Sequence, residues 1–224
     1  MDRAADLRLE PDGAERFAGA ACAVLREIDR ALVELPAGRP GLRLREARAL
    51  EPILSAQGAI GQIARRWLGD EASPVRAVLF DKSEAANWSL GWHQDRTIVV
   101  RERRDVPGFG PWTVKQGMLH VAPPFDLLAT MMTLRVHLDP VPADNAPLLV
   151  APGSHRVRVP ESEIGWVVEA CGAVACLAAA GDVWAYATPI VHASEAAARP
   201  ARRRVLQIDY AAGALPGGLA WLGV

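Results

Sequence analysis

The sequence predicts a mainly β domain with helices at its N-terminus, built as a jelly roll or a closely related sandwich. In the first third, apolar residues recur every three or four positions, which is typical of amphipathic helices. After Pro74 the pattern changes to short apolar or alternating runs, separated by Gly, Pro, Asp and Asn, which favour strands. The gaps between these runs hold no convincing crossover helix, so the sheets are expected to be antiparallel.

The helical region is expected over residues 1–72. An apolar stripe at helical spacing runs from Phe17 to Leu35, and a second apolar pattern runs from Leu44 to Leu68. A capping-box pair is expected to start the first helix, the segment PAGRPG to end it, and two glycines to break the second. These signals are Asp12 and Glu15, residues 36–41, and Gly58 and Gly61.

The β region is expected over residues 73–212, followed by a C-terminal tail at 213–224. Between its strands, residues 103–127 hold four prolines and three glycines, which predicts a long, lid-like loop. The length of 224 residues fits a single domain over 1–224. The eight expected strands are 76–82, 96–102, 131–139, 147–153, 173–179, 182–187, 190–194 and 204–211.

Composition excludes several classes of function. The formal net charge of −1 argues against nucleic-acid binding, which needs a concentrated positive surface. No apolar run approaches the roughly 20 residues of a membrane-spanning helix, and the charged N-terminus has no signal-peptide core. Three cysteines cannot all pair within one chain and lack metal-site spacing, so a reduced, cytoplasmic protein is expected.

Five histidines limit any chemistry that needs imidazole, and two of them begin a His-x-Asp motif. Residues i and i+2 of extended backbone lie on the same face, so such a pair can hold one metal ion. With a second imidazole it would form the 2-His-1-carboxylate triad that binds Fe(II) and leaves positions open. The two motifs are His93-Gln94-Asp95 and His137-Leu138-Asp139.

We favour His93 and Asp95, with His192 in IVHAS as the remote ligand. Two ligand strands must be distant in sequence but adjacent in space, and the chain leaves room for four or five strands between His93 and His192. From His137 there is room for about three. The structural alternatives are a salt bridge or capping pair at His93 and Asp95, and a buried core histidine at His192.

Four segments in order resemble the phytanoyl-CoA dioxygenase family: WHQD, DNAPLLVAPGSH, GDVWAY, and HAS with an arginine eleven positions after His192. The resemblance covers roughly residues 76–212. It implies a double-stranded β-helix core, cupin-like, and an oxygenase dependent on Fe(II) and 2-oxoglutarate. The family string has Asn-Gly where this chain has Asn145-Ala146, and alanine resists the positive φ that glycine accepts at such a turn.

The resemblance implies that His93, Asp95 and His192 hold iron and that Arg203 binds the distal carboxylate of 2-oxoglutarate, with help from Ser194. Arginine suits this role because its guanidinium donates in pairs. Strand alternation allows only one of Arg203 and Arg204 to point inward, and we favour Arg203 over Arg204. The family also places a cofactor-contacting residue on the strand of Arg135.

Several polar or aromatic residues near the metal motif or in the expected lid are candidates for the substrate pocket. The alternative for the tryptophans is packing beneath the loop, and for His120 a plain surface position. His137 is expected to face the barrel interior without binding iron. The candidates are Lys82, Asn87, Trp88, Gln94, Trp112, His120 and His137.

The expected activity is hydroxylation of a small organic metabolite by O₂, with release of succinate and CO₂. Chlorination is less favoured because related halogenases lack the carboxylate that Asp95 supplies. Two alternatives remain: a non-catalytic jelly-roll protein that binds a metal or small molecule, and a metal-dependent isomerase or hydrolase that does not use 2-oxoglutarate. The sequence predicts neither the substrate nor the oligomeric state.

Overall fold

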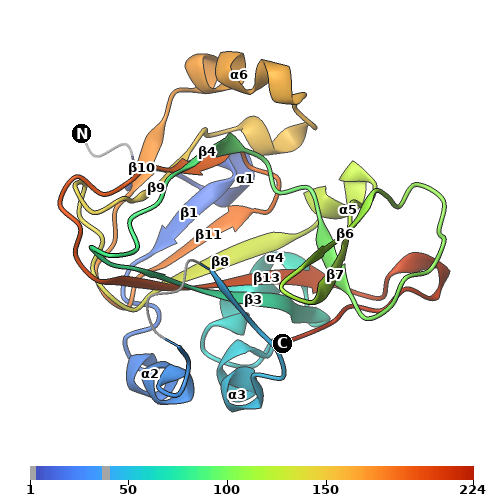
Figure 1. Cartoon of the computed structure of the whole chain (residues 1–224), viewed down its shortest axis with the longest axis horizontal. Coiled ribbons are helices and arrows are strands. Elements are labelled where there is room, and N and C mark those ends of the chain that lie inside the picture. The colour runs from blue at the N-terminus through green and yellow to red at the C-terminus, as the bar shows by residue number, and fades with distance from the viewer. Residues whose placement is uncertain (1–3, 37–40) are drawn as a thin grey trace.

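A computed structural model describes residues 4–36 and 41–224. Its largest element is a six-stranded sheet in which every pairing is antiparallel, as the sequence predicted. β13 and β3 form its longest pairing, and Figure 1 shows them side by side. In spatial order the strands are β1 (Ala14–Phe17), β11 (Val183–Ala187), β8 (Met132–His137), β13 (Arg203–Ala212), β3 (Ala72–Lys82) and β2 (Leu42–Leu44).

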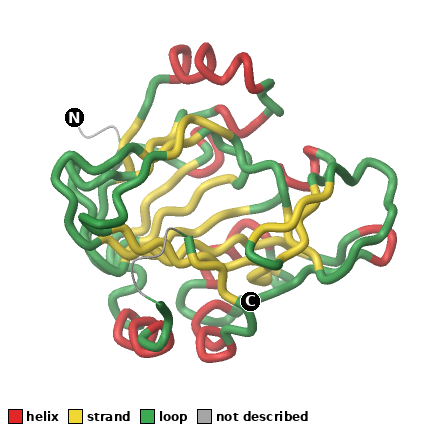
Figure 2. The backbone as a smooth tube through the Cα atoms, viewed as in Figure 1, coloured by secondary structure: helices red, strands yellow, loops and turns green. Residues whose placement is uncertain are grey.

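A four-stranded antiparallel sheet forms the second layer. Figure 2 shows the two layers of strands with helices outside them. This two-sheet arrangement confirms the predicted jelly-roll class, a mainly β core with N-terminal helices. The strands are, in order, β10 (Val174–Cys176), β9 (Leu148–Val150), β12 (His192–Ser194) and β4 (Leu90–His93).

Three helices from the first third, α2 to α4, cover the outer face of the six-stranded sheet, and the main apolar core lies between these helices and the sheet. Leu206 and Ile208 of β13 point into this core, whereas Gln207 points to the opposite side. None of the helices in the described ranges is long and apolar enough to cross a bilayer. The helices are α1 (Leu9–Asp12), α2 (Leu25–Leu32), α3 (Glu51–Leu54), α4 (Gly61–Leu68), α5 (Phe125–Ala129) and α6 (Ile164–Cys171), with 3₁₀ turns at Arg48–Leu50, Ser154–Arg156, Glu161–Glu163 and Pro216–Gly218.

The predicted helix from Phe17 to Leu35 is too long. Residues 14–17 instead form β1, which pairs with β11 at the sheet edge, and α2 begins only at Leu25. The presumed capping pair serves the short α1: Arg8 donates its backbone N–H to Asp12 at 2.8 Å, and Leu9 donates to Glu15 at 3.2 Å. The expected stop at 36–41 falls mostly on residues outside the described ranges.

The second helical pattern, from Leu44 to Leu68, is divided into β2, a 3₁₀ turn, α3 and α4. The break lies at the two predicted glycines. A Cβ at Gly61 would lie 1.9 Å from the Ser55 carbonyl oxygen, and one at Gly58 would lie 2.3 Å from that of Ile53. No larger residue fits this turn without moving the backbone.

Residues 103–127 are not the irregular loop that the sequence predicted. They contain a β-hairpin, which joins β5 to form a third, three-stranded sheet. The tail at 213–224 packs on this sheet, where Leu222 donates to Val99 at 3.2 Å. The pattern concealed the hairpin because proline and glycine cluster around two strands of only four residues each. The strands are β5 (Ile98–Val100), β6 (Trp112–Lys115) and β7 (Met118–Val121).

Candidate metal centre and its cavity

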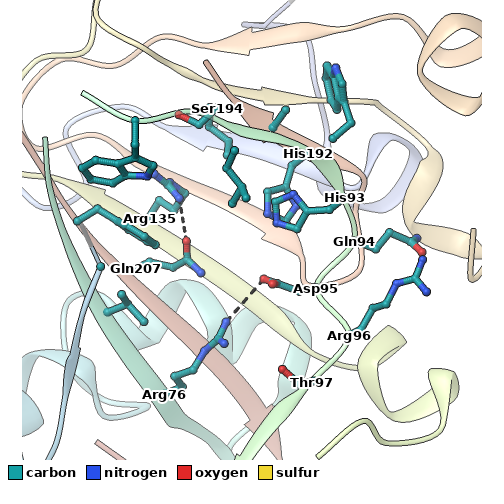
Figure 3. Close-up of a pocket in the computed structure, with 18 of the residues that line it drawn as sticks. Arg76, His93, Gln94, Asp95, Arg96, Thr97, Arg135, His192, Ser194 and Gln207 are labelled. Atoms are coloured by element: carbon teal, nitrogen blue, oxygen red, sulfur yellow. Dashed lines mark hydrogen bonds and ion pairs between the residues drawn. The ribbon is translucent and has the colours of Figure 1, made fainter. Parts of the chain in front are cut away.

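A cavity of about 660 Å³ lies between the two main sheets. Its lining comes from β3, β8 and β13 on one side and from β4 and β12 on the other. Figure 3 shows side chains from both sheets converging on it. This volume falls in the range of pockets for small organic ligands.

His93 and His192 lie directly opposite each other on the antiparallel pair β4 and β12. Their ring centroids are 4.3 Å apart. His93 donates Nδ1–H to the Gly91 carbonyl at 2.8 Å, and His192 donates Nδ1–H to the Ile190 carbonyl at 2.9 Å. A carbonyl can only accept, so both rings carry a proton on Nδ1, which leaves Nε2 as the nitrogen that can bind a metal.

Asp95 follows the end of β4 and lies beside the two imidazoles (Figure 3). One ligand atom from each of His93, Asp95 and His192 lies within 4.8 Å of the other two. Two imidazoles and one carboxylate match the donor set of a facial triad. Burial lowers the pKa of His192 to about 4 despite the attraction of Asp95, so its ring is neutral at pH 7.

Arg76 on β3 holds the carboxylate of Asp95 from the side. Its guanidinium is 3.6 Å from Asp95 and 2.5 Å from Asp209, so one cation lies between two carboxylates. Burial opposes the charge on Asp95, but Arg76 and the nearby histidines outweigh it and lower the pKa of that carboxyl. Asp95 is therefore ionised and ready to act as a metal ligand.

Three cations gather at the end of the cavity where β3 meets β13. Lys82 and Arg203 are cross-strand neighbours, and Arg135 lies on β8, bonded to Gln207 at 2.8 Å. None of the three forms an ion pair within the described ranges, and the Nε atoms of Arg135 and Arg203 are buried without a hydrogen-bond partner. An excess of buried, unsatisfied donors is typical of a site for an anion.

Burial and the repulsion among these cations lower the pKa values of two of them. Burial, together with Arg135, lowers the pKa of Arg203 to about 9. Burial also lowers the pKa of Lys82 to about 8, with the two arginines contributing. Ser194 accepts a hydrogen bond from Lys82 at 3.1 Å, which brings its hydroxyl into the same group.

Arg203 and Arg204 point to opposite sides of β13, as strand alternation predicted. Arg203 lines the cavity and donates to the carbonyl of Ala146. Arg204 lies outside it, where it donates to both oxygens of Asp139 at 2.8 and 2.9 Å and to Asp29 at 2.7 Å. Ala146 has a φ of +52°, so the departure from Asn-Gly leaves an alanine in the left-handed region at the turn that contacts Arg203.

The substrate candidates divide into two groups. Lys82, Trp88 and Gln94 line the cavity, and the Lys82 ammonium lies 4.8 Å from the Trp88 ring centre. Gln94 is held by backbone groups, including those of Val157 and Val159. The cavity lining does not include Asn87, Trp112, His120 or His137.

These four have other surroundings. Asn87 exchanges two hydrogen bonds with the backbone of Ala197, and Trp112 packs in the core of the third sheet beneath Arg103. His120 is fully buried, 3.4 Å from the Thr97 hydroxyl. His137 is 1% exposed, and neither ring nitrogen has a partner among the described residues.

Some lining residues were missed by the sequence reasoning although a signal existed. Arg76, Val78, Phe80 and Lys82 alternate along β3, and all four line the cavity. Alternate residues of a strand share a face, so the choice of Lys82 as a pocket residue already predicted that Arg76 lines the same pocket. Arg43 on β2 and Lys115 on β6 had no such signal, because neither strand was predicted.

The phytanoyl-CoA dioxygenase family model matches residues 44–205 of the chain. Comparison with curated protein sequences found no match. Among solved structures, EctD from S. alaskensis in its apo form is similar, with 21% identity and a TM-score of 0.61 over 91% of this chain and 74% of that one.

Two further structures have the same likeness. HygX from Streptomyces hygroscopicus, with nickel, 2-oxoglutarate and hygromycin B bound, has 13% identity and a TM-score of 0.62 over 91% of this chain and 84% of its own. SnoN, a non-heme α-ketoglutarate-dependent epimerase from nogalamycin biosynthesis, has 17% identity and a TM-score of 0.61 over 96% of this chain and 83% of its own. At these identities the likeness shows the fold.

The family match covers more than half of the chain, and the protein therefore belongs to the phytanoyl-CoA dioxygenase family, whose members use Fe(II) and 2-oxoglutarate.

Proposed function

We propose that the protein is an Fe(II)- and 2-oxoglutarate-dependent oxygenase that hydroxylates a small organic molecule. In this reaction O₂ and 2-oxoglutarate convert a C–H bond of the substrate to C–OH and yield succinate and CO₂. One observation carries the proposal: three metal-ligand atoms within 4.8 Å of one another share a cavity with three cations that have no ion-pair partner in the described ranges.

His93, Asp95 and His192 would hold the metal. Each imidazole is fixed by its Nδ1–H bond to a backbone carbonyl, which leaves Nε2 as the donor and orients the ring. Arg76 keeps Asp95 ionised and limits its rotation. The bound metal and cosubstrate supply the oxidative chemistry, and the protein supplies binding, orientation and exclusion of water.

Arg203 would bind the distal carboxylate of 2-oxoglutarate, with Ser194 and Arg135 beside it. A dianion would satisfy the buried guanidinium nitrogens that have no partner now. Gln207 accepts from Arg135 and Tyr186 through its carbonyl oxygen, so its amide NH₂ group is left to donate to a ligand.

The first test is spectroscopic. Adding Fe(II) and 2-oxoglutarate to the protein without oxygen is expected to give the weak visible band of the metal chelate. Arg203→Gln is expected to require at least tenfold more 2-oxoglutarate for the same band, whereas Arg204→Gln serves as the matched control. A protein that binds Fe(II) but gives no band would contradict the proposal and favour a metal-dependent isomerase or hydrolase.

A second test addresses the reaction type. Succinate formation is screened against a panel of small molecules, and each stimulating compound is then turned over under ¹⁸O₂. Hydroxylation places one labelled oxygen in the product and one in succinate. A stimulated reaction whose product contains no label would instead indicate a different oxidative outcome, such as epimerisation.

A further inference from the structure

The charges that line the cavity differ sharply from the charge of the whole chain. The chain has a formal net charge of −1, yet seven cationic side chains and two carboxylates line the cavity among the described residues. The cosubstrate site proposed above accounts for Arg135 and Arg203, and Lys82 already donates to the carbonyls of Trp88 at 2.7 Å and Glu195 at 3.1 Å and to the Ser194 hydroxyl at 3.1 Å. Arg76 is paired with Asp95 and Asp209.

Arg96 is also accounted for, because it donates to the Val159 carbonyl at 2.7 Å and lies 3.7 Å from Glu161. Two cations remain, Arg43 and Lys115. Neither forms an ion pair in the part of the chain that the structure describes. The Nε atom of Arg43 is buried and has no hydrogen-bond partner there.

Arg43 and Lys115 come from two edge elements that are bonded together. Gln116, in the turn between β6 and β7, donates to the Gly41 carbonyl at 2.9 Å and accepts from the Arg43 backbone N–H at 3.3 Å. Arg45 also donates to the Gly117 carbonyl. The turn of the hairpin is thus fixed against β2, and this junction brings both cations to the same wall of the cavity.

We propose that Arg43 and Lys115 bind a carboxylate or phosphate group of the primary substrate, which is therefore an organic anion. This inference rests on the proposed function and names the substrate class of that site. Arginine binds either anion through paired N–H donors, and lysine adds a point charge. Burial and the neighbouring Arg76 lower the pKa of Arg43 and outweigh the opposing attraction of Asp95.

The rest of the cavity defines the other part of this substrate. Leu90 and Trp92 of β4 line it from the four-stranded sheet, and Ile164 lines it from the start of α6. An apolar body would pack against these side chains while its anionic group reaches the junction of β2 and β6. The metal ligands lie in the same cavity.

Calorimetric titration with three matched probes tests the proposal: 3-phenylpropionate, 2-phenylethyl phosphate and the neutral 3-phenylpropanamide. The protein is kept without oxygen, with Fe(II) and saturating 2-oxoglutarate, so that the cosubstrate site is already filled. We expect at least one anion to bind tenfold or more tightly than the amide. The stronger anion identifies the substrate as a carboxylate or a phosphate ester.

The double variant Arg43→Gln/Lys115→Gln is expected to reduce this preference to less than twofold, and Arg43→Lys to give an intermediate ratio. Arg26→Gln, which removes an exposed charge on α2 away from the cavity, is expected to keep the full preference. Equal binding of anions and amide by the unaltered protein, or a full preference in the double variant, would overturn the proposal.

The same samples separate the two hypotheses. The visible chelate band is recorded before each titration, and its presence in the double variant also shows that the variant is folded. Absence of the band in the unaltered protein counts against the proposed oxygenase. The ratio of anion affinity to amide affinity tests only the proposed substrate class, not the oxygenase activity.

Discussion

The two His-x-Asp motifs have the same spacing but very different surroundings. His93 lies opposite His192, and Asp95 faces the cavity beside Arg76. His137 lies opposite Val205 in the six-stranded sheet, and its ring is buried without a partner among the described residues. The spacing alone thus does not make a metal site.

The partners across the strands explain the difference. Asp139 lies beyond the end of β8, where Arg204 holds both of its oxygens on the outside of the cavity. Asp95 lies beyond the end of β4, where a cation that lines the cavity holds it toward the histidines. In each motif the carboxylate therefore lies on the same side as the arginine that it contacts.

The largest expected effect is on Fe(II) affinity, which should differ between variants of the two motifs. His93→Ala is expected to weaken Fe(II) binding more than 100-fold, because it removes one of three donors. His137→Leu is expected to leave Fe(II) binding unchanged within a factor of two. Titration of Fe(II) without oxygen measures both, and loss of iron from His137→Leu alone would reverse the assignment of the two motifs.

The second effect concerns the two neighbouring arginines. Arg203→Gln is expected to raise the KM for 2-oxoglutarate at least tenfold, because it removes the buried, cavity-lining cation proposed to bind the cosubstrate. Arg204→Gln is expected to change this KM less than twofold. Steady-state succinate formation gives both values, and equal KM changes in the two variants would argue against the inward role of Arg203.

A third effect concerns how the stability of the folded protein depends on pH through His137. Burial, with Arg135 next, lowers the pKa of His137 well below 6.5, so the folded protein binds a proton there less readily than the unfolded chain does. Its contribution to stability is complete above pH 6.5 and is lost as the pH falls below that value.

His137→Leu is therefore expected to lose less stability than the unaltered protein between pH 7 and pH 5. The difference amounts to at most about 2 kcal/mol at pH 5, from about 1.4 kcal/mol per pH unit. Urea unfolding at several pH values measures it. Parallel curves for the two proteins would show that His137 titrates normally in the folded state.

The smallest expected effect concerns Asp139. Asp139→Asn weakens its hydrogen bonds with Arg204 at a site that is about one-fifth exposed, so it is expected to lower the free energy of unfolding by about 1 kcal/mol. It leaves Fe(II) affinity unchanged, whereas Asp95→Asn is expected to reduce it. Urea unfolding and metal titration on the same samples check both, and a metal defect in Asp139→Asn would contradict the contrast.

Local patterns predicted seven of the ten strands in the two central sheets, but not β1, β2 or β4, the strand that carries His93. All eight expected strands exist, and alternation correctly placed Arg203 and Arg204 on opposite faces, while the family resemblance selected Arg203 as the inward one. The reason is that residues on these strands are buried on at least one face, so their side-chain period is strict.

The edge elements were missed because their stability comes from distant partners. β1 is held by β11, which lies far along the chain, and residues 14–17 continue an apolar pattern that also suits a helix. β2 and the β6–β7 turn are joined through Gln116, a contact that no local pattern reveals. Arg43 and Lys115 were missed for the same reason.

The bonded junction of β2 with the β6–β7 turn has a consequence for how this scaffold can change. The candidate iron ligands and cosubstrate residues lie on β4, β8, β12 and β13 or just after β4, whereas Arg43 lies on β2, at the edge of the six-stranded sheet, and Lys115 lies on β6 in the third sheet. Exchange of the short hairpin tip, together with its Gln116 contact, would alter selectivity without disturbing the oxidative centre. Directed evolution toward new substrates can therefore vary this junction while the candidate iron ligands stay in place.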